Sequence, residues 1–435
     1  ATPMILIEYT RIIGFSPLSV SEPLDVIIDG AHIKEIGTGL AARYPQAEKI
    51  SSPYISPGLV CSHNHFYSAL ARGLMAPVPP SKDFVQQLNN LWWRLDRALD
   101  ADMIRASGIA GALHAIRHGV TAVIDHHASP NCIEGSLDHL AAGFELSGLR
   151  GVLCYETTDR YGNQGAEAGV AENIRFSKKT AHNPLLRGAI GAHAPFTVNN
   201  TVLALLTEAV RETGAGLHIH AAEDKFDAVH SRYQYGLDIV DRLERAEILS
   251  PKTIIAHGLY LTASEIETLN RHDAFLVHNA RSNMNNHVGY NEALHLYKNV
   301  ALGTDGIGSD MVTETICAFY KHRDAGGPLY MDTFLGMLWN GNELLNRYFP
   351  ENKFGYIAPG YAADITFWDY EPPTPLIPEN LMGHMAFGLS PAYISGTMIA
   401  GKLVMKNRTI QFDTATLLKE TQNQARRLWK AMEAI

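Results

Sequence analysis

Residues 57–65, PGLVCSHNH, lead a short apolar run into two histidines, His63 and His65. Seven further apolar runs also end at a side chain that can bind a metal or carry a proton. Their terminal groups are His126 and His127, Glu156, His193, His220, His257, His278 and Asp305. Side chains from the ends of many strands converge only when the strands run parallel and close on themselves. The sequence therefore predicts an α/β fold built on an eight-stranded (β/α)8 barrel of TIM type, with these groups around its catalytic mouth.

The apolar runs are separated by segments of helix length, which include residues 101–118, 202–213, 236–245 and 263–271. This alternation of strand and helix is typical of a parallel sheet. Residues 1–56 and 355–412 instead show β-type alternation with hairpin signals. We expect these two ends to pair into a small composite β-sandwich domain beside a barrel of residues 57–354. A C-terminal helix is predicted over residues 413–435. Residues 68–100 form either a lid over the mouth or an extra helix that buries its tryptophans.

The composition excludes several partners. Lys and Arg number 36 against 45 Asp and Glu, a net charge of −9, and no basic block stands out, so nucleic acid and anionic membranes are not expected as partners. No apolar stretch reaches the roughly 18–20 residues of a membrane span, and no leader pattern opens the chain, which predicts a cytoplasmic protein. The four cysteines form no Cys-x-x-Cys pair, so His and carboxylate groups must hold any metal. A homo-oligomer is the default expectation.

His63 and His65 face the same side because alternate residues of a strand do so. His220 ends the fifth run, and Asp305 ends the last run beside the first. Three imidazoles and one carboxylate suit a single catalytic divalent ion, zinc first and iron(II) second. His218 lies one layer below His220 and is expected to be a hydrogen-bonded core histidine.

Glu223 follows the fifth strand, where the chain turns over the mouth and reaches both water and substrate. A divalent metal lowers the pKa of a bound water from 15.7 towards about 7, which makes hydroxide available at neutral pH. Glu223 is then the expected proton shuttle, a role worth roughly 10²- to 10⁴-fold. His257 orients or polarises the same water, and Asp305 accepts its proton. Attack on a carbon that bears an amino group gives a deaminated product.

The other side chains at the mouth are candidates for binding a small polar substrate, with a structural hydrogen bond as the alternative for each. These candidates are His193, His126, His127, Glu156, His278 and Asn279. Two other functions stay open at this point. The same groups suit hydrolysis of a carbon–halogen or cyclic amide bond, and an inactive barrel would bind a ligand or help to assemble a partner enzyme.

The motifs together resemble the amidohydrolase superfamily over nearly the whole chain. The resemblance rests on the stretches Pro57–His65, Ala192–Pro195, His218–Glu223, Ala256–Gly258, His278–Asn283 and Gly303–Asp305. Within the superfamily they are similar to the mononuclear aminohydrolases and chlorohydrolases, which include guanine, adenosylhomocysteine and cytosine deaminases. The resemblance implies a metal-dependent deaminase of a purine, pterin or pyrimidine type of heterocycle.

The same resemblance implies roles for individual residues. It places the metal on His63, His65, His220 and Asp305, makes Glu223 the proton shuttle and sets His257 beside the water. Two positions depart from the common pattern. Asn64 stands where many relatives have Thr, and Ala280-Arg281 replaces a Pro-x pair, which makes Arg281 a candidate substrate contact.

Overall fold

The computed structural model describes residues 3–435, and its centre is a closed parallel barrel. The barrel strands are β7 (Leu59–Asn64), β8 (Val120–His127), β9 (Arg150–Tyr155), β10 (Leu186–Gly188) with β11 (Ile190–Ala192), β12 (Leu217–Ala221), β13 (Ile254–His257), β14 (Phe275–His278) and β15 (Val300–Leu302). Neighbours pair in this order, and β10 and β11 are two halves of the fourth strand. The last strand returns to the first, where the Thr304 amide donates to the His63 carbonyl at 2.9 Å. The predicted barrel is confirmed.

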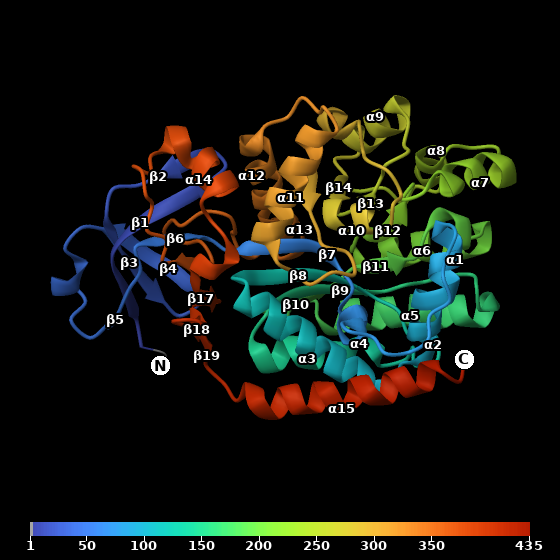
Figure 1. Cartoon of the computed structure of the whole chain (residues 1–435), viewed down its shortest axis with the longest axis horizontal. Helices are drawn as coiled ribbons and strands as arrows, with labels where there is room; N and C mark the ends of the chain where they lie inside the picture. Colours follow the sequence, from blue (N-terminus) through green and yellow to red (C-terminus); the bar gives the residue numbers. More distant parts are fainter. Residues whose placement is uncertain (1–2) are drawn as a thin grey trace.

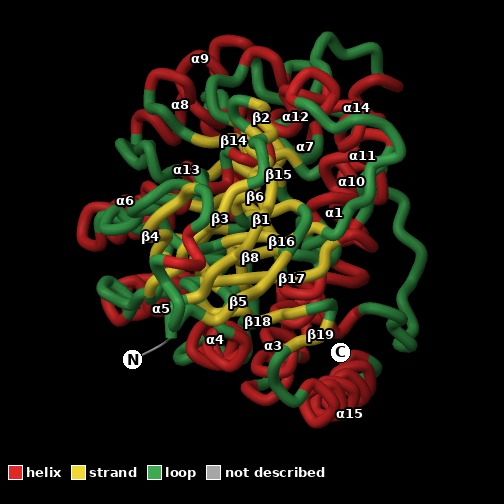
Figure 2. Tube along the Cα trace, turned by 90° about the vertical axis from the view of Figure 1, so that its left-hand side faces the viewer, coloured by secondary structure: helices red, strands yellow, loops and turns green. Residues whose placement is uncertain are grey.

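The helices surround the barrel, as Figures 1 and 2 show. They include α3 (Ala101–Arg117), α4 (Ser136–Ser147), α5 (Gly162–Lys179), α6 (Asn200–Thr213), α8 (Ile239–Arg245), α9 (Ala263–Arg271), α11 (Met311–Asp324), α12 (Met331–Trp339) and α13 (Gly341–Tyr348). Every residue of β8 and β9 is buried, because the barrel core covers one face and the helices cover the other. This double burial explains why the barrel strands read as unbroken apolar runs.

Strands from both chain ends form a second, ten-stranded sheet, which faces the viewer in Figure 2. Its order is β19 (Thr409–Ile410), β18 (Lys402–Lys406), β17 (Ile394–Ile399), β16 (Ile365–Trp368), β6 (Tyr54–Pro57), β1 (Ile5–Phe15), β3 (Leu24–Asp29) and β4 (His32–Gly37). The short strands β2 (Leu18–Val20) and β5 (Glu48–Ser51) also pair with β1. Strand β6 joins the two ends, since it runs parallel to β1 and antiparallel to β16. The chain ends therefore build one composite β unit, while the numerical domain limits stay a prediction.

A buried ion pair ties this unit to the barrel. Arg150, in β9, donates from Nε to Asp364 Oδ2 at 2.7 Å and from Nη2 to Oδ1 at 3.0 Å. The two side chains are only 2% and 5% exposed. The Ala400 amide also donates to Asp364 Oδ1 at 2.8 Å. Asp364 thus neutralises a charge that water cannot reach.

The Asp364→Ala variant is expected to lose about 3–5 kcal/mol of unfolding free energy, because it leaves the Arg150 guanidinium buried without a counter-ion. Urea unfolding followed by circular dichroism measures this loss. The matched control is Asp369→Ala, which removes an ion pair to Arg408 whose side chains are 50% and 36% exposed. This control should cost no more than about 1 kcal/mol. Equal losses in the two variants would contradict the structural role of Asp364.

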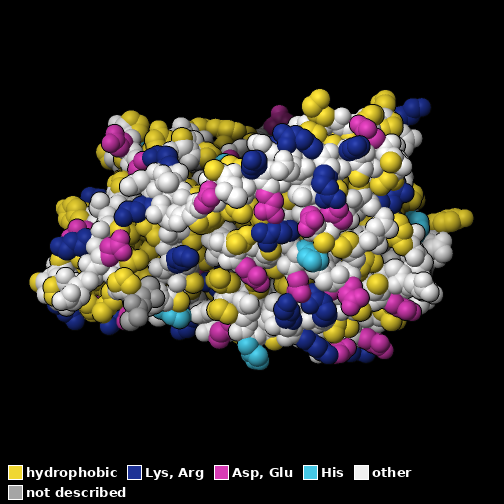
Figure 3. Space-filling view, turned by 90° about the horizontal axis from the view of Figure 1, so that it is seen from below, with side chains coloured by type: hydrophobic (Ala, Val, Ile, Leu, Met, Phe, Trp, Pro, Cys, Tyr) yellow, Lys and Arg dark blue, Asp and Glu magenta, His cyan; other side chains and the backbone are white. Residues whose placement is uncertain are grey.

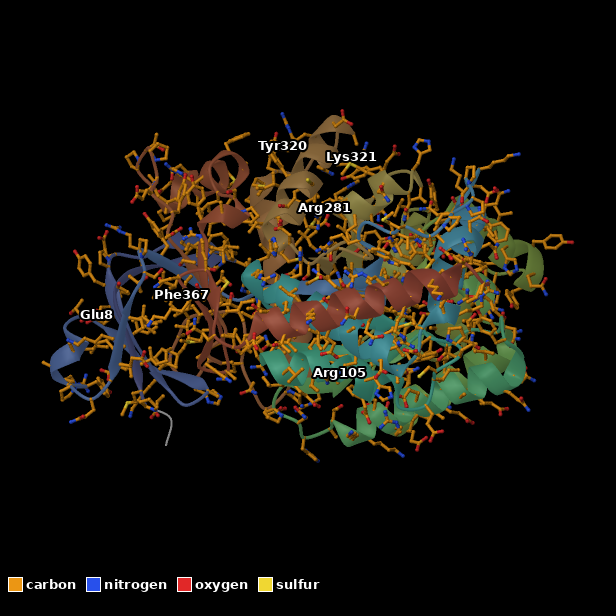
Figure 4. The ribbon with its side chains drawn as sticks, turned by 60° about the horizontal axis from the view of Figure 1, so that its bottom comes forward. Glu8, Arg105, Arg281, Tyr320, Lys321 and Phe367 are labelled. Carbon is orange, nitrogen blue, oxygen red and sulfur yellow. The ribbon has the colours of Figure 1, made fainter. Side chains whose placement is uncertain are left out.

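The C-terminal helix α15 (Thr414–Met432) runs beneath the barrel along α3 (Figure 1). Arg105 of α3 pairs with Glu420 of α15 at 2.9 Å, and Figure 4 shows Arg105 beside this helix. On the underside, which Figure 3 shows, basic and acidic side chains are interspersed. Among residues 3–435, no helix combines the length and the apolarity that crossing a membrane requires.

Candidate active site

Four side chains that the sequence analysis assigned to a metal meet at the carboxyl ends of β7, β12 and β15. Asp305 Oδ1 lies 2.9 Å from His65 Nε2 and 3.3 Å from His63 Nε2. His220 Nε2 lies 3.2 Å from His65 Nε2. All four residues are buried, with exposed fractions of 8% or less. The closed barrel therefore brings together residues that are up to 242 positions apart in the chain.

The hydrogen bonds behind two of these imidazoles direct a lone pair into the cluster. His65 Nδ1 lies 2.7 Å from the carbonyl oxygen of His126, and His220 Nδ1 lies 2.7 Å from the carbonyl oxygen of His193. Because a carbonyl only accepts, each Nδ1 carries the ring hydrogen and each Nε2 keeps its lone pair. This arrangement is the one in which histidine binds a metal through Nε2.

The remaining imidazoles complete the cluster. His63 Nδ1 lies 2.8 Å from Nε2 of His218, which is fully buried one layer below and orients the His63 ring. One potential ligand atom from each of His63, His220, His257 and Asp305 lies within 4.8 Å of the other three. Imidazole nitrogens and a carboxylate at this spacing form a metal site of the kind that zinc occupies in proteins.

His257 differs from the other imidazoles in its hydrogen bonding. The Asn283 side-chain amide is oriented so that its Nδ2 donates to His257 Nδ1 at 2.9 Å. The ring hydrogen of His257 is therefore on Nε2. Within residues 3–435 this buried Nε2 has no hydrogen-bond partner, and it lies 3.5 Å from Glu223 Oε1 and 3.9 Å from Asp305 Oδ2. Burial lowers the pKa of His257 to about 3, so the ring is neutral. A neutral N–H aimed at the cluster suits a hydrogen bond to an oxygen held there.

Glu223 reaches the cluster from the turn that follows β12. The turn is fixed by the buried carboxylate of Asp227, which accepts from the Ala222 amide at 2.8 Å and the Phe196 amide at 3.1 Å. Ala222 itself has a positive φ of 51°. Burial raises the pKa of Glu223 well above its usual range, and the charge of Asp305 adds to this effect. Glu223 therefore holds a proton more readily than an exposed carboxyl group does.

Asp305 has the opposite electrostatic balance. Burial opposes its ionisation, but hydrogen bonds from His63 and His65 in their protonated forms hold the pKa of Asp305 well below its usual range. Ser282 Oγ also donates to Asp305 Oδ2 at 2.5 Å. The site therefore places the carboxylate of Asp305, which stays ionised, near the carboxyl group of Glu223, whose raised pKa favours the protonated form. Such divergent carboxyl groups are typical of acid/base sites.

A pocket opens above the cluster, and part of the 68–100 segment forms its roof. This segment folds into α1 (Phe84–Gln87), the π-helical turn η3 (Leu88–Trp92) and α2 (Trp93–Ala98). The side chains of Phe84, Leu88, Trp92 and Trp93 line the pocket together with Glu223. Gln87 Nε2 donates to Asn286 Oδ1 at 3.1 Å and ties the segment to the opposite wall. The tryptophans thus face the site, as the lid interpretation expects.

Two of the predicted substrate contacts, Glu156 and His193, line the pocket. Of the others, His126, His127, His278 and Asn279 do not line it and are fully buried. His126 Nε2 donates to the Ala192 carbonyl at 2.9 Å, and His127 Nε2 lies 2.8 Å from Ser129 Oγ. The structure therefore does not bring these four side chains to the pocket wall.

Arg281 is also held away from the pocket. Its Nε donates to Glu314 Oε1 at 2.9 Å, and its Nη2 donates to the Gly308 carbonyl at 3.0 Å. Glu314 is fully buried, and the Arg281 side chain is 17% exposed. The guanidinium thus compensates a buried carboxylate of α11, and Arg281 is not among the residues that line the pocket.

Sequence reasoning missed three polar residues around the pocket, namely Arg160, Asp96 and Thr197. Arg160 pairs with Glu156 at 3.0 Å and with Asp96 at 3.8 Å, and Thr197 Oγ1 lies 2.6 Å from His193 Nδ1. All three lie outside the barrel strands. No strand pattern marks them, and only the i, i+4 spacing of Glu156 and Arg160 was a usable signal.

This barrel and its cluster of imidazoles and carboxylates define a metal-dependent hydrolase. The model of the amidohydrolase family matches residues 54–404, and the chain belongs to that family and is a hydrolase acting on C–N bonds. One relative is the 5-methylthioadenosine/S-adenosylhomocysteine deaminase of Thermococcus sibiricus, 28% identical over 88% of this chain and 89% of that protein.

Solved structures show the same fold. An adenosine deaminase from Xanthomonas campestris with bound zinc superimposes with a TM-score of 0.86 at 22% identity, over 98% of each chain. The atrazine chlorohydrolase TrzN from Arthrobacter aurescens, complexed with zinc, gives a TM-score of 0.81 at 20% identity, over 97% of this chain and 100% of that one. The chain therefore spans these relatives at nearly full length.

Proposed function

We propose that the protein is a hydrolytic deaminase that removes an amino group from a nitrogen heterocycle of the purine, pterin or pyrimidine type. The observation that carries this proposal is the position of Glu223 beside both the metal cluster and the pocket, with a pKa raised by burial. A leaving amine must be protonated, and a carboxyl group whose pKa is raised by burial can take a proton from the attacking water and pass it to the amine. The deaminase relative named above adds support.

The pocket favours a compact, planar substrate. Its volume is about 210 Å³, and Trp92, Trp93 and Phe84 contribute aromatic surface to it. Sites for drug-sized ligands usually enclose about 300–1,000 Å³, so one ring system fits this pocket better than an extended ligand.

The metal would be held by His63, His65, His220 and Asp305, and we propose zinc rather than iron(II). When bound, such an ion lowers the pKa of a water towards about 7 and so supplies a nucleophile at neutral pH. The zinc-containing relatives support this choice.

The proton transfers and the stabilisation of charge are assigned to the side chains of Glu223 and His257. Glu223 accepts a proton from the attacking water and delivers it to a ring nitrogen or to the departing amine. The His257 N–H stabilises the negative charge that develops on the attacking oxygen. A C–O bond forms, the C–N bond breaks, and the products are an oxo-heterocycle and ammonia.

The direct test is a screen for ammonia release by the zinc-loaded protein. A panel of aminopurines, aminopterins and aminopyrimidines should contain compounds that release ammonia in proportion to enzyme concentration. Halide and ring-opened acid are measured in parallel on chlorinated and cyclic amide analogues. Release of halide or ring-opened acid without any ammonia would contradict deamination and favour the corresponding hydrolase.

A further inference from the structure

One wall of the pocket carries a buried carboxylate that the proposed chemistry does not use. Glu156 directly follows strand β9 at the mouth of the barrel. It lines the pocket and is only 4% exposed. Its Oε1 accepts from Arg160 Nη2 at 3.0 Å. The side chain of Arg160 is 12% exposed, so this contact is largely shielded from water.

Arg160 is itself held in place. Its guanidinium carbon lies 3.9 Å from the centre of the Trp93 ring, and Nη2 lies 3.8 Å from Asp96 Oδ2. Asp96 is 1% exposed. An arginine fixed between an aromatic face and two carboxylates cannot swing away from Glu156 without leaving buried charge unpaired. The structure therefore presents Glu156 to the pocket in a set orientation. Burial raises the pKa of Glu156, and the charge of Arg160 opposes that rise.

Among residues 3–435, no side chain or amide donates to the second oxygen of Glu156, whereas Arg160 donates to the first. His126 Nδ1 lies 3.6 Å from this second oxygen. His126 Nε2 donates to the carbonyl oxygen of Ala192, so Nδ1 bears a lone pair and offers no hydrogen. This Nδ1 is itself buried and has no hydrogen-bond partner in the part of the chain that the structure describes. Glu156 Oε2 is thus an acceptor that still requires a donor.

His193 offers a second acceptor in the same wall. The Thr197 hydroxyl lies 3.2 Å from the Ala194 carbonyl and 2.6 Å from His193 Nδ1, and it accepts from Nδ1 when it donates to that carbonyl. In this tautomer the ring hydrogen of the buried imidazole is on Nδ1, and Nε2 presents a lone pair. One potential ligand atom from each of Glu156, His193 and His220 lies within 4.8 Å of the other two. The two acceptors are close enough to contact one small molecule.

We propose that Glu156 and His193 form a subsite for two N–H donors on one edge of the substrate. The ligand class is an uncharged planar heterocycle that carries a second amino group, or a ring N–H, besides the amino group that leaves. Among the described residues that line the pocket there is no Lys or Arg, so a carboxylate or phosphate on the ligand would have no cationic partner there. This inference rests on the proposed function and specifies its substrate.

The test compares pairs of compounds that differ by one amino group. Adenine is paired with 2,6-diaminopurine, and 4-aminopyrimidine is paired with 2,4-diaminopyrimidine. Calorimetry on the zinc-loaded full chain gives their dissociation constants, and ammonia release gives kcat/KM. A hydrogen bond to a buried charged acceptor is worth about 10- to 100-fold, so the diamino member of at least one pair should bind that much more tightly.

The variant Glu156→Gln keeps the shape of the side chain but removes the carboxylate, and it should reduce this preference at least about fivefold. The matched control is Glu167→Gln in α5, where the glutamate is exposed, and it should keep the parental preference. Equal binding within both pairs, a preference that survives in Glu156→Gln, or no measurable binding of any of the four compounds would overturn the proposal.

The outcomes separate this inference from the proposed function. Selective, Glu156-dependent binding without ammonia release would support the subsite and contradict deamination. Ammonia release without any preference within the pairs would support deamination and overturn the subsite.

Discussion

The Glu223→Gln variant is expected to lose about 10²- to 10⁴-fold in kcat on any substrate that the parent deaminates. The carboxamide keeps the size of the side chain and its place beside His257, where Glu223 Oε1 lies 3.5 Å from Nε2. It cannot take a proton from water or give one to the leaving amine. KM should change little, because the substrate contacts remain, and steady-state ammonia release measures both parameters.

The matched control is Glu247→Gln, since the side chain of Glu247 is 75% exposed. It should keep the parental kcat and KM. A Glu223→Gln variant with unchanged kcat would contradict the proton shuttle. Unchanged ligand binding together with no turnover in either protein would instead favour the inactive ligand-binding barrel.

Loss of the metal is expected to have the largest effect. Removing it with a chelator, or replacing His220 by Ala, should reduce turnover by at least about 10⁴-fold, because the pKa of water returns from about 7 to 15.7. Metal content by mass spectrometry should fall from near one ion per chain towards zero. Zinc should restore the chelated parent, and it should not restore the variant at stoichiometric concentration.

The control for this substitution is His182→Ala, because His182 is an exposed histidine. It should keep both the metal and the activity. A His220→Ala protein with parental metal content and parental turnover would contradict the assignment of His220 to the metal site. Full activity of a chelated, metal-free parent would contradict any catalytic role for the ion.

The barrel was predictable from the sequence because its strands are buried on both faces. Such strands carry unbroken apolar runs, and the polar residue that ends each run marks the mouth. Strand parity brings His63 and His65 to one side, and the order of the strands brings Asp305 back to them at 2.9–3.3 Å. The positions of the four proposed ligands follow from these two local rules and from closure of the barrel.

The pocket wall was less predictable, because it depends on contacts between distant segments. Arg281 pairs with Glu314, which lies 33 residues away, and Arg160 contacts Asp96 of helix α2. Neither pairing leaves a periodic pattern in the sequence. Glu156 and His193 line the pocket, while His126 and His278 are fully buried and do not line it.

The central claim is that one divalent ion binds to Nε2 of His63, His65 and His220 and to the carboxylate of Asp305. A crystal of the zinc-loaded protein, with anomalous data collected at the zinc edge, tests this claim most directly. The account predicts one strong peak per chain, with these four ligands at about 2.0–2.2 Å. A peak bound instead by Glu156, His193 and His220, or no peak within reach of Asp305, would contradict it.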